Sequence, residues 1–223
     1  MNLMKRCKQL LCNKKGEASY NYILLIVSLM LINLFYGTLE NNLAILTVNE
    51  IRDVLESCAP NAIRAGIEED SIKNETIVES YNVNRAIETF AEEVSKTLSG
   101  TSFASRIKTS SNSNISSRNA PSKREIYDKV VENTMVSVAS GDWANTNNDR
   151  NVDVAVLTTV LPLEIKHSNP VSTGQRIEQS FSRIDANGNF ISAGSDNSFN
   201  VSVDVGAHSV GVLIKFETRM ILK

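Results

Sequence analysis

The sequence has few of the residues that build catalytic or metal sites. Its 223 residues include two histidines, three cysteines and one tryptophan. Neither His167 nor His208 belongs to a His-x-x-x-His, Gly-x-Ser-x-Gly or phosphate-loop motif. A serine nucleophile needs a base beside it, and neither histidine lies in a sequence context that suggests one. We therefore expect no enzymatic activity, no cofactor and no metal site.

Charge is also absent from one long segment near the N-terminus. The 22 residues from Ala18 to Leu39 contain no charged side chain. At about 1.5 Å per residue a helix of this length spans about 33 Å, against about 30 Å for the hydrocarbon core of a bilayer. Helices of globular proteins usually carry charges on one face, and this segment carries none. We therefore expect a transmembrane helix over residues 17–39.

A cleaved secretory signal is the second alternative for this segment. Such a signal has a shorter apolar core, followed by a small-x-small cleavage site. The residues that follow the core here read "NLFYGTLENNLA", which contains no convincing site of that kind. An uncleaved signal anchor therefore stays open beside a helix that is processed on its N-terminal side.

The flanking charges predict how the helix is oriented. The charged residues that precede it are all basic: Lys5, Arg6, Lys8, Lys14 and Lys15. The other flank begins with Glu40. Cytoplasmic flanks of membrane helices are rich in Lys and Arg. We expect a single-pass protein of the cell membrane, with a cytoplasmic N-terminus and residues 40–223 outside.

The junction between the basic residues and the apolar run carries a family resemblance. A short basic leader ends in Lys14-Lys15-Gly16-Glu17, and an almost wholly apolar helix follows. This arrangement resembles type IV pilin-like precursors, and most closely the Tad-type, TadE-like pseudopilins. The resemblance covers about residues 12–39. It implies that a prepilin peptidase cuts after Gly16, and that Glu17 becomes the N-terminus of a subunit assembling with other pilin-like subunits.

The residues after the cut depart from the family pattern in one position. Such pilins usually carry Glu as the fifth residue after the cut, followed in the Tad group by an aromatic residue. Here the fifth residue is Asn21 and the sixth is Tyr22. Asn21 can accept a hydrogen bond but has no charge, and Glu17 supplies the only carboxylate. The resemblance therefore implies a minor pseudopilin of a Tad-like pilus, secretion or conjugation apparatus, with Glu17, Asn21 and Tyr22 involved in assembly.

The apolar helix also contains polar residues at Ser28, Asn33 and Tyr36. In lipid such groups form hydrogen bonds between helices, each worth about 0.6–2 kcal/mol. Ser28 and Asn33 are thus candidates for lateral association with another subunit. Alternatively, Ser28 bonds to its own helix, while Asn33 and Tyr36 lie near the outer interface.

Removal of the leader would change both charge and cysteine content. A cut after Gly16 removes five of 23 basic residues and none of 25 acidic ones, which leaves a formal charge of −7. An acidic domain is a poor electrostatic partner for nucleic acid. Cys7 and Cys12 leave with the leader, so Cys58 has no intramolecular disulfide partner. We expect a buried thiol, with an intermolecular disulfide as the alternative.

Helical periodicity continues beyond the membrane segment. The apolar residues Ala44, Val48, Ile51, Leu55 and Cys58 form one stripe of a stalk helix. Pro60 is expected to end that helix. A second apolar stripe runs over residues 83–98. Residues 40–98 are therefore assigned to a helical stalk region.

The next segment changes in composition before a third helix begins. Residues 99–121 are rich in Ser, Asn and Thr, which predicts a flexible linker or a long surface loop. Ser122-x-x-Glu125 is a capping box at the start of a helix. Its apolar stripe is expected to run through Met135 and Val138, and Gly141 is expected to end it.

The C-terminal part has the two-residue period of strands. Val152, Val154 and Val156 alternate with other residues, as do the residues of 199–205 and 210–222. Asn187-Gly188 predicts a hairpin turn. We expect half-buried antiparallel strands with one wet face, arranged as a meander of four or five strands. The predicted fold class is α+β: a transmembrane helix that continues into a stalk, further helices, and a C-terminal β-meander within residues 122–223.

Two loops and one aromatic residue are weaker candidates for binding. Residues 142–149 and 185–189 are rich in Asp and Asn, as calcium loops are, but neither is closed by a Glu. Ordinary Asx turns explain them better. Trp143 is expected to anchor packing rather than stack on a ligand. The alternative function is therefore an uncleaved, signal-anchored surface protein that binds an extracellular partner through its β-domain.

Overall fold

The computed structural model describes six parts of the chain: residues 14–67, 81–109, 120–141, 152–167, 174–182 and 198–222. The chain divides into two units, Met1–Ile45 and Leu46–Lys223, each of which we describe by itself. The elements comprise a long N-terminal helix, further helices and antiparallel strands. The predicted α+β class is therefore confirmed.

Helix α2 extends from Lys14 to Ala65, so the prediction that Pro60 ends it is wrong. A proline inside a helix removes one backbone hydrogen bond and costs about 3 kcal/mol. Around Pro60, however, the side chains of Ala59, Ala62 and Ile63 are fully buried in the core. Packing of this last part of α2 offsets the local cost, and the helix continues for five residues after the proline.

Tyr81 closes the C-terminal end of α2. Its hydroxyl donates a hydrogen bond of 2.9 Å to the carbonyl of Ile63 in the last turn of the helix, which also accepts from the N–H of Gly66 at 3.2 Å. The backbone N–H of Asn82 donates to the carbonyl of Gly66 at 2.8 Å. These two hydrogen bonds hold Tyr81 and Asn82 against the end of α2, where the Tyr81 ring lies against Gly66.

Helix α4, Val83–Ser99, confirms the second predicted helix. The Asn82 side chain accepts a hydrogen bond from the N–H of Arg85 and caps its start. The buried face includes Phe90, Val94 and Leu98, at the spacing of one helix side. The apolar stripe of α4 therefore packs in the main core.

The third predicted helix is shorter than expected. Helix α5, Lys123–Glu132, begins with the predicted capping box, in which Ser122 and Glu125 bond reciprocally. Asn133 ends the helix, and Thr134–Gly141 forms strand β1 rather than its last turns. The β-branched side chains at alternate positions of this segment favour a strand. The helical spacing of Met135 and Val138 was coincidental.

The strands do not form a meander. Strand β2, Val152–Lys166, pairs with β1 on one side and with β5, Ser209–Leu222, on the other. Strands β3, Gln175–Ser182, and β4, Ser198–Val205, pair antiparallel as a separate two-stranded sheet. The β3–β4 pair is thus inserted in sequence between two strands that are neighbours. The predicted turn at Asn187-Gly188 lies outside the described residues.

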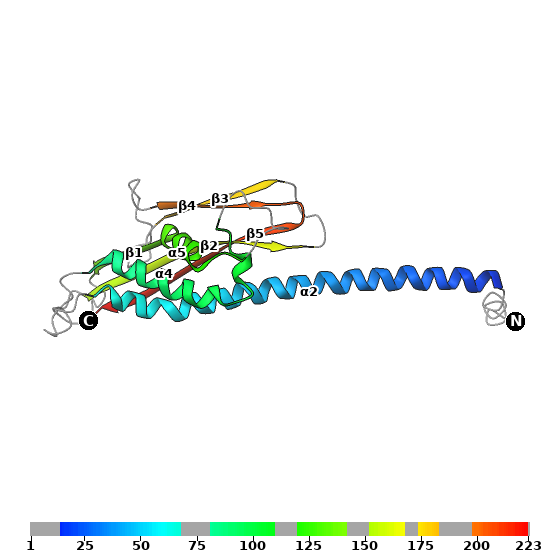
Figure 1. Ribbon diagram of the computed structural model, residues 1–223, viewed down its shortest axis with the longest axis horizontal. Coiled ribbons are helices and arrows are strands. Elements are labelled where there is room, and N and C mark those ends of the chain that lie inside the picture. Colours follow the sequence, from blue (N-terminus) through cyan, green and yellow to red (C-terminus); the bar gives the residue numbers. More distant parts are fainter. Residues whose placement is uncertain are drawn as a thin grey trace. The chain divides into compact units, whose positions relative to one another are not determined.

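Strand β2 is buried on both faces, because it lies between two layers. Leu157 and Leu161 belong to the core that includes α4, α5 and the last part of α2. Val160, on the opposite face, packs with Phe181 of β3 and Val201 of β4. Figure 1 shows the β3–β4 pair on one side of the three-stranded sheet and α4 on the other. The predicted wet face is therefore wrong for β2.

The segment after α4 is packed rather than extended as a linker. Residues 104–106 form a short 3₁₀ helix, η1 (Ala104–Arg106). Ile107 forms a bridge with Leu163 of β2, and Ala104 and Ile107 are fully buried. Of the two predicted alternatives, residues 101–109 form a packed loop rather than a flexible linker, and residues 110–119 lie outside the described parts.

Candidate functional site

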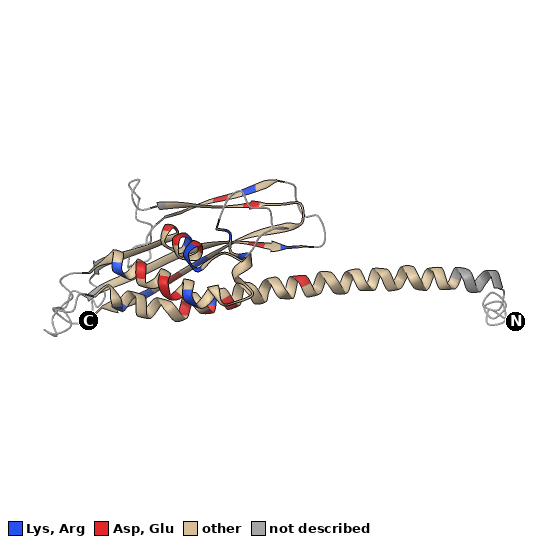
Figure 2. Ribbon diagram, viewed as in Figure 1, with Lys and Arg blue, Asp and Glu red and all other residues tan. Residues whose placement is uncertain are grey.

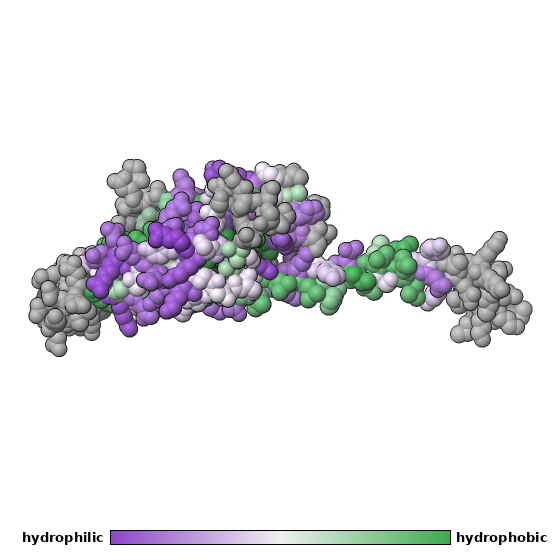
Figure 3. Space-filling model, in the orientation of Figure 1, coloured by the Kyte–Doolittle hydropathy of each residue, from purple (hydrophilic) through white to green (hydrophobic). Residues whose placement is uncertain are grey.

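An exposed apolar segment of α2 is the main candidate site. Helix α2 is long and apolar enough near the N-terminus to cross a membrane, and none of its most apolar window is buried. Leu25 is 55% exposed, and the other large apolar side chains from Tyr20 to Leu39 are similarly open. Figure 2 shows this stretch free of charged residues, and Figure 3 shows its hydrophobic surface. A membrane-spanning length of apolar helix is therefore available for contact with lipid or another helix.

The residues predicted to be processed lie at the start of this helix. Gly16 and Glu17 fall within α2 by their backbone conformation, and their side-chain contacts are outside what the structure describes. Asn21 and Tyr22 are exposed on the same helix. The structure thus places Glu17, Asn21 and Tyr22 in one continuous helix, within about one and a half turns.

The two polar residues in the middle of the segment differ in their hydrogen bonding. The Ser28 hydroxyl donates to the carbonyl of Leu25 at 2.8 Å, so it is bonded within its own helix. Asn33 is exposed, and its side chain has no hydrogen-bond partner among the residues described. An amide left without a hydrogen bond in an apolar medium costs several kcal/mol. Asn33 is therefore the polar group of this segment that most needs an external partner.

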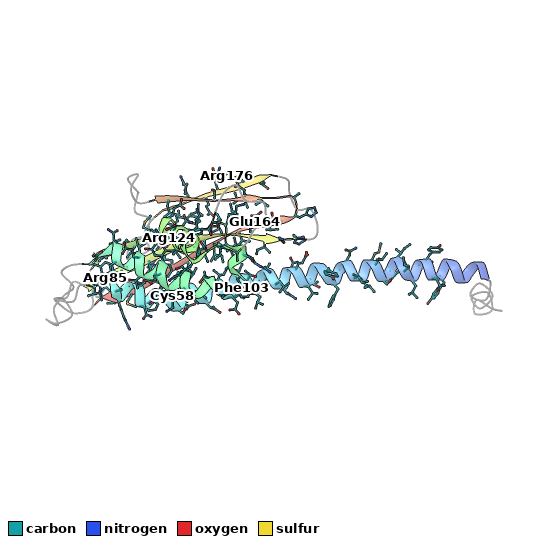
Figure 4. All side chains as sticks on the ribbon, viewed as in Figure 1. Cys58, Arg85, Phe103, Arg124, Glu164 and Arg176 are labelled. Carbon is teal, nitrogen blue, oxygen red and sulfur yellow. The ribbon has the colours of Figure 1, made fainter. Side chains whose placement is uncertain are left out.

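A buried polar cluster, which sequence reasoning missed, lies in the C-terminal unit. The Lys108 Nζ donates to the Glu164 carboxylate at 3.0 Å, and the two side chains are only 7% and 4% exposed. The Ser209 hydroxyl donates to the other carboxylate oxygen at 2.9 Å. Figure 4 labels Glu164, which lies on β2; Ser209 is the first residue of the neighbouring strand β5, and Lys108 lies in the segment after η1. We call Lys108, Glu164 and Ser209 the buried clamp.

The hydrogen bonds of the buried clamp indicate a structural role. The backbone N–H of Lys108 donates to the carbonyl of Pro162 at 2.9 Å, which aligns the segment after η1 with β2. The Ser209 hydroxyl also accepts a hydrogen bond of 2.7 Å from the N–H of Gly206, in the β4–β5 turn. The carboxylate thus holds two separate segments against β2. The glutamate between the apolar residues Leu163 and Ile165 was the sequence signal that could have indicated this.

Cys58 and the two histidines are the remaining candidates for reactive groups among the described residues. Cys58 is buried and free, and burial raises the pKa of its thiol, which favours the predicted structural role over an intermolecular disulfide. The backbone N–H of His167 donates to the carbonyl of His208 at 2.9 Å, which joins the ends of β2 and the β4–β5 turn. Within the described parts of the chain, no three His, Cys, Asp or Glu side chains are grouped to hold a metal ion. The two Asp/Asn-rich loops and Trp143 lie outside those parts.

The chain was compared with family models, curated proteins and solved structures. No family model, curated protein or solved structure matches the chain. The functional argument therefore depends on the exposed apolar segment and on the residues at its N-terminal end.

Proposed function

We propose that the protein is a membrane-anchored structural subunit: a minor pseudopilin of a Tad-like pilus, secretion or conjugation apparatus, processed after Gly16. The observation that carries this proposal is the exposed, uncharged segment of α2. The same helix contains residues, from Ile51 to Ile63, that are buried in the core of the C-terminal unit. One helix thus provides both a membrane anchor and part of a folded domain.

The cost of exposing apolar side chains to water supports the membrane part of the proposal. Burying one large apolar side chain is worth about 1.5–3 kcal/mol relative to exposing it to water. More than a dozen such side chains are exposed between residues 20 and 39. Exposing them together to water would cost more than the typical stability of a domain, about 5–15 kcal/mol. Lipid, or lipid together with other helices, covers this segment.

The basic leader supports processing on the cytoplasmic side. Lys14 and Lys15 hold the residues before the apolar segment in the cytoplasm, by the same charge rule that sets the orientation. Gly16 has no side chain, so its backbone can enter a protease cleft at the membrane surface. Cleavage there leaves Glu17 at the inner interface as the new N-terminal residue.

Intact-mass measurement of the membrane fraction tests the processing step. With a functional prepilin peptidase present, we expect a mature chain that begins at Glu17 and lacks the leader. The variant Gly16→Leu is expected to keep the leader, because a bulky side chain at the cleavage site blocks access. It should still insert into the membrane but be absent from any assembly.

Gly37→Leu is the matched control, since Gly37 lies in the same helix and a side chain there meets nothing within 4 Å. We expect this variant to be processed like the native chain. A native protein that keeps its leader while the peptidase is active would contradict the pseudopilin proposal. The uncleaved, signal-anchored surface protein would then take its place.

A further inference from the structure

The exposed apolar segment contains one stripe with the spacing of a coiled-coil seam. Its residues alternate at steps of three and four: Tyr22, Leu25, Leu29, Ile32, Tyr36, Leu39 and Leu43. We call these residues the heptad stripe. Each of them lies in α2 and is exposed. Steps of three and four keep residues on one face, which is the pattern that two supercoiled helices bury between them.

Residue composition distinguishes this assignment of the seam positions from the other assignments that a heptad repeat allows. A wholly apolar helix could present such a seam on any side, so the position of the polar residues decides. Every other assignment between residues 22 and 43 places at least one Gly, Ser, Thr, Asn or Glu in the seam. The heptad stripe alone contains none of these. It therefore marks one face of the segment as the apolar contact face.

Two of the three polar residues, Ser28 and Asn33, flank the heptad stripe in a self-complementary way, and the third, Tyr36, belongs to the stripe. In heptad positions Ser28 is a g residue and Asn33 is the e residue of the next heptad. In a parallel pair of helices, a g residue of one helix lies beside that e residue of the other. The Ser28 hydroxyl donates to Leu25 and keeps lone pairs that can accept. The Asn33 amide of a second copy can donate to it, and two-fold symmetry forms this bond twice.

The orientation and length of the stripe both favour a second copy as the occupant. All copies insert with the basic flank inside, so their helices are parallel and place the stripe at the same depth. Leu43 lies beyond Glu40, which ends the uncharged run, yet it is 48% exposed. A transmembrane helix is tilted by about 20° on average, which does not bring residues this far out into the hydrocarbon. Lipid therefore does not cover Leu43, whereas the same face of a parallel second copy would.

We propose that the chain forms a parallel homodimer in the membrane through the heptad stripe, with Asn33 of each copy hydrogen-bonded to Ser28 of the other. The inference rests on the membrane span in the proposed function, but not on processing after Gly16. It assigns Ser28 and Asn33 a common role as a pair across one interface.

Disulfide trapping in native membranes tests the contact face. The full chain would carry a single cysteine, at Leu43→Cys or at Ile45→Cys, with Cys7, Cys12 and Cys58 replaced by serine or alanine. Ile45 is the matched control, since it is two residues away and, at 60%, more exposed than Leu43, but lies off the stripe. Under mild oxidation we expect Leu43→Cys to give at least fivefold more covalent dimer. Equal trapping at both positions would overturn the proposal.

Association of the full chain in detergent tests the polar pair. Asn33→Leu is expected to weaken the dimer about tenfold, equivalent to about 1.4 kcal/mol for two hydrogen bonds. Leu34→Ala, the control at the neighbouring position outside the stripe, should leave association unchanged. An unchanged dissociation constant for Asn33→Leu would overturn the Ser28–Asn33 pairing. Alkaline extraction of the membranes distinguishes the failure of this proposal from the failure of the proposed function. Release of the protein by alkali would contradict the membrane anchor. A protein that stays in the membrane as a monomer would contradict only the dimer.

Discussion

Replacement of Glu164 by alanine is expected to lower the free energy of unfolding of the C-terminal unit by about 3–5 kcal/mol. The change leaves the Lys108 ammonium buried without the carboxylate that it contacts at 3.0 Å. It also removes the acceptor of the Ser209 hydroxyl. Desolvation of the remaining charge then opposes folding, and both the segment after η1 and the β4–β5 turn lose a side-chain hydrogen bond to β2. Urea denaturation of the full chain in detergent, followed by circular dichroism, measures the loss.

Glu178→Ala is the matched control for this measurement. Glu178 forms an ion pair of 2.8 Å with Arg176 on β3, but the two side chains are 64% and 57% exposed. Exposed pairs contribute about 0–1 kcal/mol, so the control should change little. The double variant Lys108→Met/Glu164→Leu should recover much of the loss, because it leaves no buried charge unpaired. A loss for Glu164→Ala no larger than that for Glu178→Ala would contradict the buried clamp.

Replacement of Gly66 by alanine is expected to cost about 1–3 kcal/mol through overpacking. A Cβ at this position would lie 2.6 Å from the hydroxyl oxygen of Tyr81 and 2.8 Å from its Cε1. The ring must shift, and its hydrogen bond to the Ile63 carbonyl is then lost. The end of α2 then loses this hydrogen bond to the residue that precedes the cap of α4. Thermal unfolding followed by circular dichroism measures the change.

Gly100→Ala provides the comparison, because Gly100 also follows a helix but a side chain there meets nothing within 4 Å. Its φ of −88° suits any residue, so we expect a change within about 0.5 kcal/mol. Equal stability of the two glycine variants would contradict this account of the α2 end.

Burial raises the pKa of Tyr81 to about 12, above its ordinary value of 10.0. The neutral Tyr81 hydroxyl therefore gives its full contribution to stability below pH 10, and this contribution is lost as the pH rises towards 12.

Local signals in the sequence predicted the elements that depend on neighbouring residues. The capping box at Ser122 and Glu125 formed as expected, because both partners lie within one helical turn. The stripe of α4 and the alternation of β5 were confirmed for the same reason: Phe90 and Ile214, for example, point into the core at the expected periods. Periodicity reports which face is buried, and it does not depend on distant parts of the chain.

Features that depend on distant contacts could not be predicted in this way. Pro60 stays inside α2 because of tertiary burial around it. The place of β2 between two layers follows from its pairing with β5, across an inserted β3–β4 pair. Lys108 lies in a Ser-rich stretch with no local sign that it meets Glu164, which is 56 residues away in sequence. Within the candidate site, the uncharged segment was readable from composition, whereas only the structure shows that Ser28 bonds to its own helix, at Leu25, which was one of two predicted alternatives.

Accessibility labelling of intact cells is the most direct test of the central claim that α2 anchors the C-terminal unit outside the membrane. A single cysteine would be added after Lys223, in a chain in which Cys7, Cys12 and Cys58 are replaced by serine. The account predicts that a membrane-impermeant maleimide labels this cysteine in intact cells, while a cytoplasmic marker protein stays unlabelled. Labelling that occurs only after the membrane is disrupted would contradict the account.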